Sequence, residues 1–153
     1  VIISEFCDFE DITENFKSST SIREVKAFIS NEWNFYDCHS FSLGHGEKQL
    51  SNDTSLASLY TGEDLILDIH SYQVTVKSEN SGPRSFEFPL VIQGEHSNNE
   101  AEIIENYVDV TQGIRREHLS FHALQPDEML VPLRDEYVLP GGTVIVKVNN
   151  LRQ

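Results

Sequence analysis

The sequence predicts an α+β fold in two consecutive units, each a small mixed sheet crossed by one helix. Each half of the 153-residue chain contains one amphipathic segment with helical periodicity, at residues 21–33 and 99–110. In each half, two segments with the apolar alternation of strands precede that helix, and further short strands follow it. Because the same order of elements occurs twice, we expect an internal structural repeat.

The first unit is expected to begin with two strands. Apolar side chains alternate over residues 1–9 and, more weakly, over residues 12–16, with an acidic bend between them. After the helix, residues 39–46 are typical of a short strand that ends at two glycines. A turn-rich connection with a short helical turn at residues 55–59 then leads to a strong closing strand at residues 63–69.

The first helix has a defined start and a single apolar face. Ser21 precedes Glu24 by three residues, which is the spacing of a capping box. Ile22, Val25 and Ile29 recur at helical spacing. This stripe needs an apolar surface to cover it, and the concave face of the small sheet supplies one. Two antiparallel strands followed by a helix that crosses the sheet form a β-grasp arrangement.

The second half is expected to repeat this plan. Its strands are predicted at residues 71–78, 84–92, 117–124, 128–133 and 143–148. The apolar face of its helix is expected to consist of Ile103, Ile104, Tyr107 and Val110. The glycine pair at residues 141–142 precedes a strand and is typical of a turn. No flexible linker separates the halves, so the predicted domains are residues 1–70 and 72–150.

The charge of the chain restricts its partners. The formal net charge is −14, with 13 acidic and 4 basic side chains in residues 1–71 (−9) and 12 and 7 in residues 72–153 (−5). Such a field repels phosphate backbones and anionic lipid, so we expect neither nucleic acid nor membrane insertion. A protein with a basic surface is the natural complement. The alternative is that the acidity only maintains solubility.

Two segments of the first half carry a resemblance to a known family. "TSIREVKAFI" (residues 20–29) resembles the helix start of ubiquitin-like domains, and "GEKQLSNDTSLASLY" (residues 46–60) is similar to their "GKQL…D…TL…Y" segment. The resemblance covers residues 1–70, whereas residues 72–150 resemble the family only in their pattern of elements. It implies tandem ubiquitin-like domains.

Two departures from ubiquitin itself affect the expected function. Conjugated members of the family end in a flexible tail that closes on paired glycines, whereas this sequence ends in "VNNLRQ". Ser42 and Asp68 match positions that carry two residues of the apolar surface patch of ubiquitin. A carboxylate there is incompatible with the usual apolar docking of small ubiquitin-binding helices. The resemblance therefore implies a binding module rather than a conjugated modifier.

The residue patterns indicate no catalysis, metal or cofactor. His118 and His122 are four apart on a predicted strand, hence about 13 Å apart, which is too far to share one ion directly. Cys38 and His39 are neighbours whose side chains are expected to point apart. No helix start follows the glycine pairs, so they form no phosphate cradle. We therefore expect no enzyme activity.

The candidate protein-binding residues fall into three groups. The first is an acidic strip of Glu5, Asp8, Glu10, Asp11 and Glu14. This strip is either a docking site for an Arg- or Lys-rich segment or a solvated edge. Trp33 and Tyr36 follow the first helix, where they contribute to the core, contact the second domain or form a hot spot for a partner. Ser42 and Asp68 complete the set.

The leading expectation is a non-catalytic interaction or regulatory module in a larger intracellular protein, cytoplasmic or alternatively nuclear. The chain begins without Met, which suggests flanking domains. The ubiquitin pathway is one setting that the resemblance implies, because such tandem modules occur in deubiquitinases, ligases and adaptors. Two other functions stay open: a two-domain modifier whose glycine-ending tail is missing, and the head of a scaffold or cytoskeletal adaptor.

Overall fold

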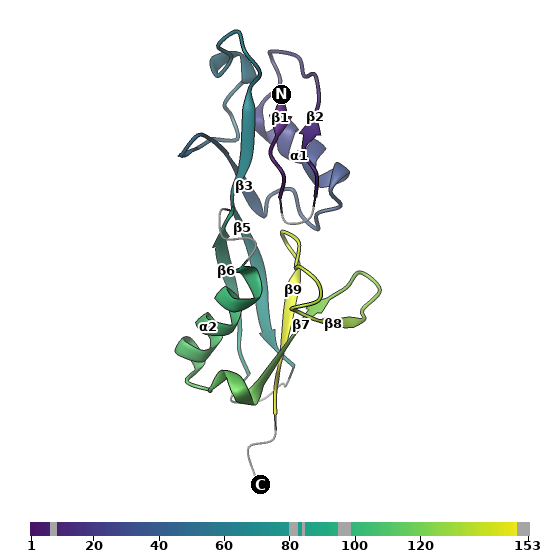
Figure 1. Ribbon diagram of the computed structural model, residues 1–153, viewed down its shortest axis with the longest axis vertical. Coiled ribbons are helices and arrows are strands. Elements are labelled where there is room, and N and C mark those ends of the chain that lie inside the picture. Colours follow the sequence, from purple (N-terminus) through teal and green to yellow (C-terminus); the bar gives the residue numbers. More distant parts are fainter. Residues whose placement is uncertain (7–8, 80–82, 84, 95–98, 150–153) are drawn as a thin grey trace.

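The computed structural model describes residues 1–6, 9–79, 83, 85–94 and 99–149. It is elongated, with two lobes arranged along the long axis (Figure 1). The first lobe contains β1 (Ile2–Ile3), β2 (Ile12–Thr13), α1 (Ile22–Glu32), β3 (Phe41–His45), β4 (Lys48–Gln49) and the 3-10 turn η1 (Leu56–Ser58). The second contains β6 (Glu87–Gln93), α2 (Glu100–Gln112), the 3-10 turn η3 (Arg116–His118), β7 (Leu119–Leu124), β8 (Leu130–Pro132) and β9 (Thr143–Val148). The strand β5 (Ile66–Ser78) belongs to both lobes.

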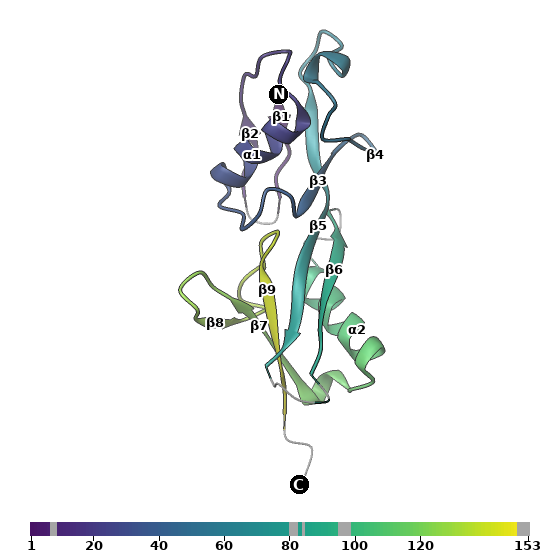
Figure 2. The same ribbon diagram turned by 180° about the vertical axis from the view of Figure 1, so that it is seen from behind.

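The long strand β5 joins the two lobes directly (Figures 1 and 2). In the first lobe, its residues 66–67 pair with β1 and its residues 68–72 with β3. In the second lobe, residues 71–77 pair with β6 and residues 75–78 with β9. The pairings with β3 and β6 overlap at residues 71–72, so the lobes adjoin without a linker. The predicted strands on either side of the expected domain boundary are therefore one continuous strand.

A β-bulge in β5 lies where the lobes meet. The register with β3 shifts between Ser42, which pairs with Ser71, and Leu43, which pairs with Ile69. The alternation of buried side chains shifts by one residue at the bulge. The buried residues before the bulge are Leu65, Leu67 and Ile69, and those after it are Tyr72, Val74 and Val76. The extra residue thus lets a single strand supply apolar side chains to both lobes. The buried apolar residues form one contiguous cluster.

The two lobes have the same strand order. In the first lobe it is β2-β1-β5-β3-β4, and in the second it is β6-β5-β9-β7-β8. In each lobe the first and last strands are parallel neighbours, and the other pairs are antiparallel. One helix connects the second and third strands of each lobe. Figure 1 shows α1 behind the strands of its lobe and α2 in front of its own, and Figure 2 shows the reverse. The predicted α+β class is confirmed.

The first helix forms as expected. The hydroxyl of Ser21 accepts the backbone N–H of Glu24 at 3.3 Å, which satisfies one of the free donors at the helix start. Ile22, Val25 and Ile29 are each fully buried. The predicted N-cap at Ser21 and the apolar stripe are therefore confirmed. The Glu24 carboxylate accepts the hydroxyl of Ser21 at 3.4 Å.

The apolar face predicted for the second helix is partly wrong. Ile104 and Val108 are fully buried, but Tyr107 is 43% exposed and Val110 is 80% exposed. The buried stripe of α2 begins with the carboxylate of Glu100, which is only 2% exposed. Because a stripe that starts with a charged residue is not recognised as apolar in the sequence, the predicted face is rotated around the helix axis relative to the observed one.

The opening strands are shorter than predicted. Among the described residues of the expected spans 1–9 and 12–16, which leave out residues 7–8, the strands cover Ile2–Ile3 and Ile12–Thr13. An isolated bridge between Phe6 and Phe9 follows β1. Among the residues that the structure describes, no helix is long and apolar enough to cross a membrane.

Candidate functional site

Part of the predicted acidic strip forms one surface. Glu5, Glu10 and Asp11 line a shallow hollow together with Ser4. The carboxylate of Asp11 accepts the backbone N–H of Glu5 at 2.6 Å, which holds the two ends of the segment together. All three acidic side chains are exposed. We call Glu5, Glu10 and Asp11 the acidic edge.

Glu14, another member of the predicted strip, does not join the acidic edge. The backbone carbonyl of Glu14 accepts the terminal amino group of Val1 at 3.0 Å, and the Glu14 side chain is absent from the hollow. Asp8 lies outside the described residues. Glu10 and Asp11 are therefore the predicted acidic residues that the structure brings together with Glu5.

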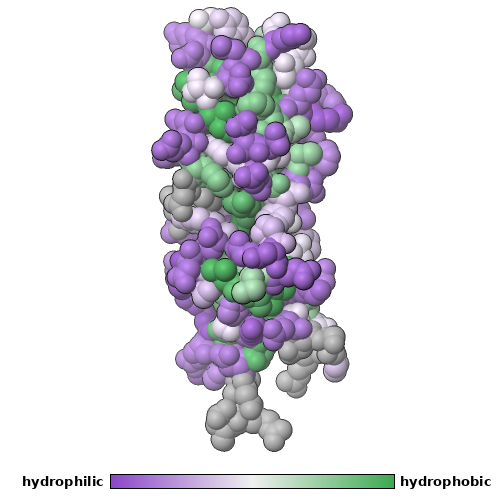
Figure 3. All heavy atoms as spheres, turned by 90° about the vertical axis from the view of Figure 1, so that its right-hand side faces the viewer, coloured by the Kyte–Doolittle hydropathy of each residue, from purple (hydrophilic) through white to green (hydrophobic). Residues whose placement is uncertain are grey.

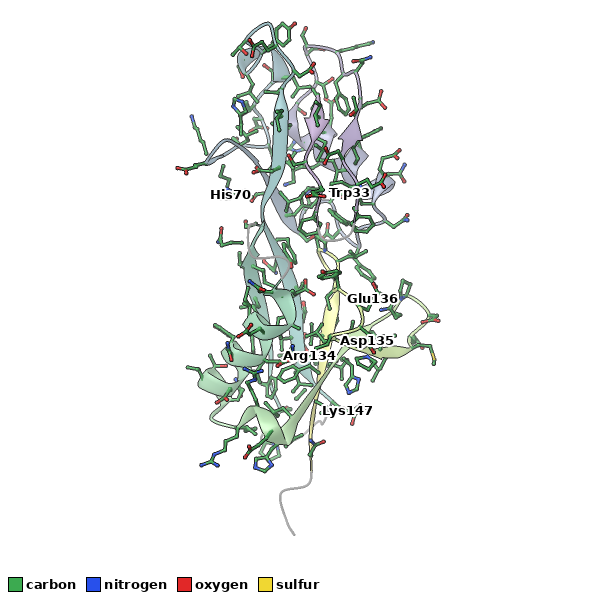
Figure 4. All side chains as sticks on the ribbon, in the orientation of Figure 1. Trp33, His70, Arg134, Asp135, Glu136 and Lys147 are labelled. Carbon is green, nitrogen blue, oxygen red and sulfur yellow. The ribbon has the colours of Figure 1, made fainter. Side chains whose placement is uncertain are left out.

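Trp33 belongs to an aromatic core near the lobe junction. Its side chain is 5% exposed, and its ring stacks on Phe9 at 5.5 Å and on Phe6 at 6.2 Å between centroids. Phe6 also contacts Tyr72 of β5 edge-to-face at 5.1 Å. Figure 4 shows Trp33 inside the lower part of the first lobe. A side chain this buried contributes mainly to packing and offers little area to a partner.

Tyr36 connects the two lobes. Its hydroxyl donates a hydrogen bond to the carbonyl of Leu124 at 3.2 Å, and its backbone N–H donates to the carbonyl of Pro140 at 3.1 Å. Partial burial raises the pKa of the Tyr36 phenol most, and the negative charges of Asp127 and Glu136 raise it further. The side chain is still 45% exposed. Contact with the second lobe, one of the roles expected for Tyr36, is therefore observed.

Backbone hydrogen bonds to Gln73 of β5 fix the junction from both lobes. Gln73 donates its N–H to the carbonyl of Ser40 at 2.7 Å and accepts the N–H of Gly141 at 2.8 Å. Gly141 has a φ of +84°, and a Cβ at this position would lie 2.9 Å from the Cβ of Asp37. The predicted glycine turn is confirmed, and it packs against the first lobe. The lobes are therefore held in one relative orientation.

Gly141→Ala is expected to lower the free energy of unfolding by about 2 kcal/mol, because it combines an unfavourable positive φ with a clash at the junction. Gly113→Ala is the matched control, since Gly113 has a φ of +67° and open space around it. The control should cost only about 1 kcal/mol. Denaturant unfolding of both variants gives the comparison. Equal losses would contradict a tight contact between Gly141 and the first lobe.

Ser42 and Asp68 lie on a polar part of the β3–β5 face. The hydroxyls of Ser42 and Ser71 are 2.8 Å apart and share a hydrogen bond. Asp68 is exposed and pairs with Gly44. Partial burial raises the pKa of Asp68, while the charge of His70 acts in the opposite direction. His70 lies on β5 where it crosses between the lobes (Figure 4). Around Ser42 and Asp68 this face presents hydroxyl, carboxylate and imidazole groups, and Ile66, two residues before Asp68 on β5, adds one exposed apolar side chain.

Two clusters of titratable groups were not predicted. The ligand atoms of Asp37, Cys38 and His39 lie within 4.8 Å of one another, so the expectation that Cys38 and His39 point apart is wrong. The second cluster surrounds Glu100, whose carboxylate accepts the hydroxyl of Tyr72 at 2.5 Å and the N–H of Val138 at 2.8 Å. Burial raises the pKa of Glu100 to about 7, against the effect of these two hydrogen bonds.

The comparisons with known proteins give no family for this chain. No model of a protein family matches it, and no curated protein matches it in sequence.

Proposed function

We propose that the chain is a non-catalytic protein-interaction module made of two ubiquitin-like β-grasp domains. The observation that supports this most is the repeated strand order, with a helix between the second and third strands in each lobe. The two segments that resemble the family, residues 20–29 and 46–60, form α1 with its cap and the β4–η1 region. This placement supports the proposal, because the resemblance implies a capped helix and a strand followed by a short helical turn for these two segments.

The acidic edge is the surface that we assign to partner binding. The three carboxylates of Glu5, Glu10 and Asp11 are exposed and adjoin one hollow, and the chain carries a net charge of −14. A segment rich in Lys or Arg complements this surface and is guided to it by the wider field of the protein. The space-filling view in Figure 3 shows a largely hydrophilic face with apolar areas interrupted by polar side chains.

The polar β3–β5 face supports a different mode of recognition from that of ubiquitin. With Ser42 and Asp68 on this face, an apolar helix that docked there would leave a carboxylate desolvated. We therefore propose that partners of the first lobe bind through the acidic edge. The fixed junction contributes by holding both lobes at one orientation, so a partner that touches both lobes loses less entropy on binding.

The double substitution Glu10→Gln and Asp11→Asn is expected to weaken binding of a basic partner roughly tenfold at low salt and to flatten its salt dependence. The measurement is the affinity, at low and high salt, of a partner captured by the intact chain. Glu63→Gln with Asp64→Asn is the matched control, because these exposed neighbours belong to another part of the first lobe. If both double variants bind alike at every salt concentration, the acidic edge has no role in partner binding.

A further inference from the structure

A tight turn after α1 gathers three side chains of different chemistry. The carboxylate of Asp37 accepts the backbone N–H of His39 at 2.8 Å, and its backbone carbonyl accepts the hydroxyl of Ser40 at 2.6 Å. The turn bends the chain so that a carboxylate oxygen, the sulfur of Cys38 and an imidazole nitrogen of His39 lie within 4.8 Å of one another. Consecutive residues on an extended segment would point to alternate sides.

Contacts with the second lobe hold both ends of this turn. Before it, the N–H of Tyr36 donates to the carbonyl of Pro140 at 3.1 Å. After it, the carbonyl of Ser40 accepts the N–H of Gln73 at 2.7 Å. The backbone that carries the three side chains is therefore fixed, as a preorganised binding site requires. Asp37 and His39 are exposed and Cys38 is partly buried, so the side chains can be reached from solvent.

We propose that this turn is a binding site for a single zinc-type divalent ion. Asp37 supplies a carboxylate oxygen, Cys38 a thiolate and His39 an imidazole nitrogen. This donor set, with one soft sulfur and one imidazole, favours Zn²⁺ over the hard ions Ca²⁺ and Mg²⁺. As the metal–sulfur bond forms, the S–H bond of Cys38 breaks and its proton passes to solvent water. Three protein ligands leave a fourth position for water or for a group of a partner.

The separations between the three ligand atoms are close to those of a tetrahedral zinc site. Bond lengths of about 2.0–2.3 Å in a tetrahedral site place the ligand atoms roughly 3.3–3.5 Å apart. The ligand atoms of the three residues are at most 4.8 Å apart, and rotation of the exposed side chains of Asp37 and His39 shortens these separations to the required value. The backbone N–H of His39 also orients the Asp37 carboxylate, in the way that outer hydrogen bonds orient metal ligands.

The surrounding charges both favour and limit the affinity. The net charge of −14 raises the local concentration of cations. Lys26, however, acts electrostatically on both Cys38 and Asp37, and its ammonium group repels a divalent ion. Lys26 is also fixed, since its Nζ donates to the side-chain oxygen of Asn52 at 3.0 Å. We therefore expect reversible rather than permanent metal binding. This site does not depend on the proposed interaction function.

The test uses Co²⁺ as a spectroscopic substitute for Zn²⁺ on the full chain. A thiolate-to-cobalt charge-transfer band should appear on titration and should disappear when Zn²⁺ is added. Cys38→Ser should abolish the band, and His39→Ala and Asp37→Asn should each weaken Co²⁺ binding at least about tenfold. Cys7→Ser and His45→Ala are the matched controls and should leave the titration unchanged.

Three results would overturn the proposal. The first is that wild-type protein shows no charge-transfer band with excess Co²⁺. The second is that Cys38→Ser keeps the band while Cys7→Ser loses it. The third is that His39→Ala and Asp37→Asn both bind Co²⁺ as tightly as wild type. Thermal unfolding gives an independent readout, because Zn²⁺ should raise the Tm of the wild type but not that of Cys38→Ser.

Discussion

Tyr72→Ala is expected to lower the free energy of unfolding by about 3–5 kcal/mol and to weaken both lobes together. Tyr72 is 1% exposed and lies in β5, the strand that the lobes share. Its ring packs on Phe6 of the first lobe, and its hydroxyl donates to Glu100 of the second. The substitution therefore opens a cavity and also removes a hydrogen bond from a buried carboxylate.

Two probes of denaturant unfolding check this expectation. The fluorescence of Trp33, the single tryptophan of the chain, reports on the first lobe, and far-ultraviolet circular dichroism reports on both lobes. The two transitions should coincide in the wild type and move together in Tyr72→Ala. Tyr60→Ala is the control, because Tyr60 is 66% exposed and should change stability by less than about 0.5 kcal/mol. Separate transitions for the two probes would contradict a shared strand that couples the lobes.

Glu100→Gln is expected to remove a large part of the pH dependence of stability. Burial raises the pKa of Glu100 from 4.5 to about 7 in the folded protein. The folded state therefore holds a proton that the unfolded state has lost between these pH values. The resulting stabilisation is fully present below pH 4.5 and is lost as the pH rises through 7. The loss amounts to roughly 3 kcal/mol for a shift of this size.

The variant should therefore gain stability relative to wild type as the pH rises. Denaturant unfolding at pH 5 and pH 8 gives the two differences in free energy. The side-chain amide that this substitution introduces can still accept the N–H of Val138, and it does not titrate, so this position should no longer make stability depend on pH. Glu102→Gln is the control, since Glu102 is exposed on the same turn of α2. A Glu100→Gln effect of the same size at both pH values would show that the carboxylate does not titrate in this range.

Local signals in the sequence were sufficient for α1 and insufficient for α2. The start of α1 depends on Ser21 and Glu24, and its buried face on residues within three turns. In α2, the buried face begins with Glu100, whose burial depends on Tyr72 and Val138 far away in the sequence. A glutamate is normally expected to face solvent, so the predicted apolar face left out Glu100. That face instead included Val110, which is exposed.

The continuity of β5 and the cluster of Asp37, Cys38 and His39 were also not predicted, because both depend on contacts between distant parts of the chain. The apolar alternation of β5 breaks at His70 and Ser71, which in the sequence alone resembles a gap between domains. Only the pairing with β3 identifies this break as a bulge. Similarly, the side chains of Cys38 and His39 converge because Asp37 bends the turn and contacts from the second lobe hold it. Such long-range causes leave no periodic signal in the sequence.

The sequence did not show how the acidic residues of the predicted strip are grouped. Glu10 and Asp11 share a hollow with Glu5 because the chain bends back near them, whereas Glu14 is tied to the start of the chain. Trp33 was an ambiguous residue at the sequence level, since an aromatic after a helix suits both a core and an interface. Its stacking on Phe6 and Phe9 shows that it packs within the protein.

The sharing of β5 also has a consequence for synthesis on the ribosome. The two parallel pairings that complete the sheets join β1 to β5 and β5 to β9, elements that are far apart along the chain. Until Thr143–Val148 has emerged, the β9 side of residues 75–78 in the nascent chain has no partner strand. An open edge of apolar strand invites pairing with other chains. The strand β9, which follows the other strands of the second lobe in chain order, therefore both completes this lobe and closes the edge through which a partly synthesised chain would aggregate.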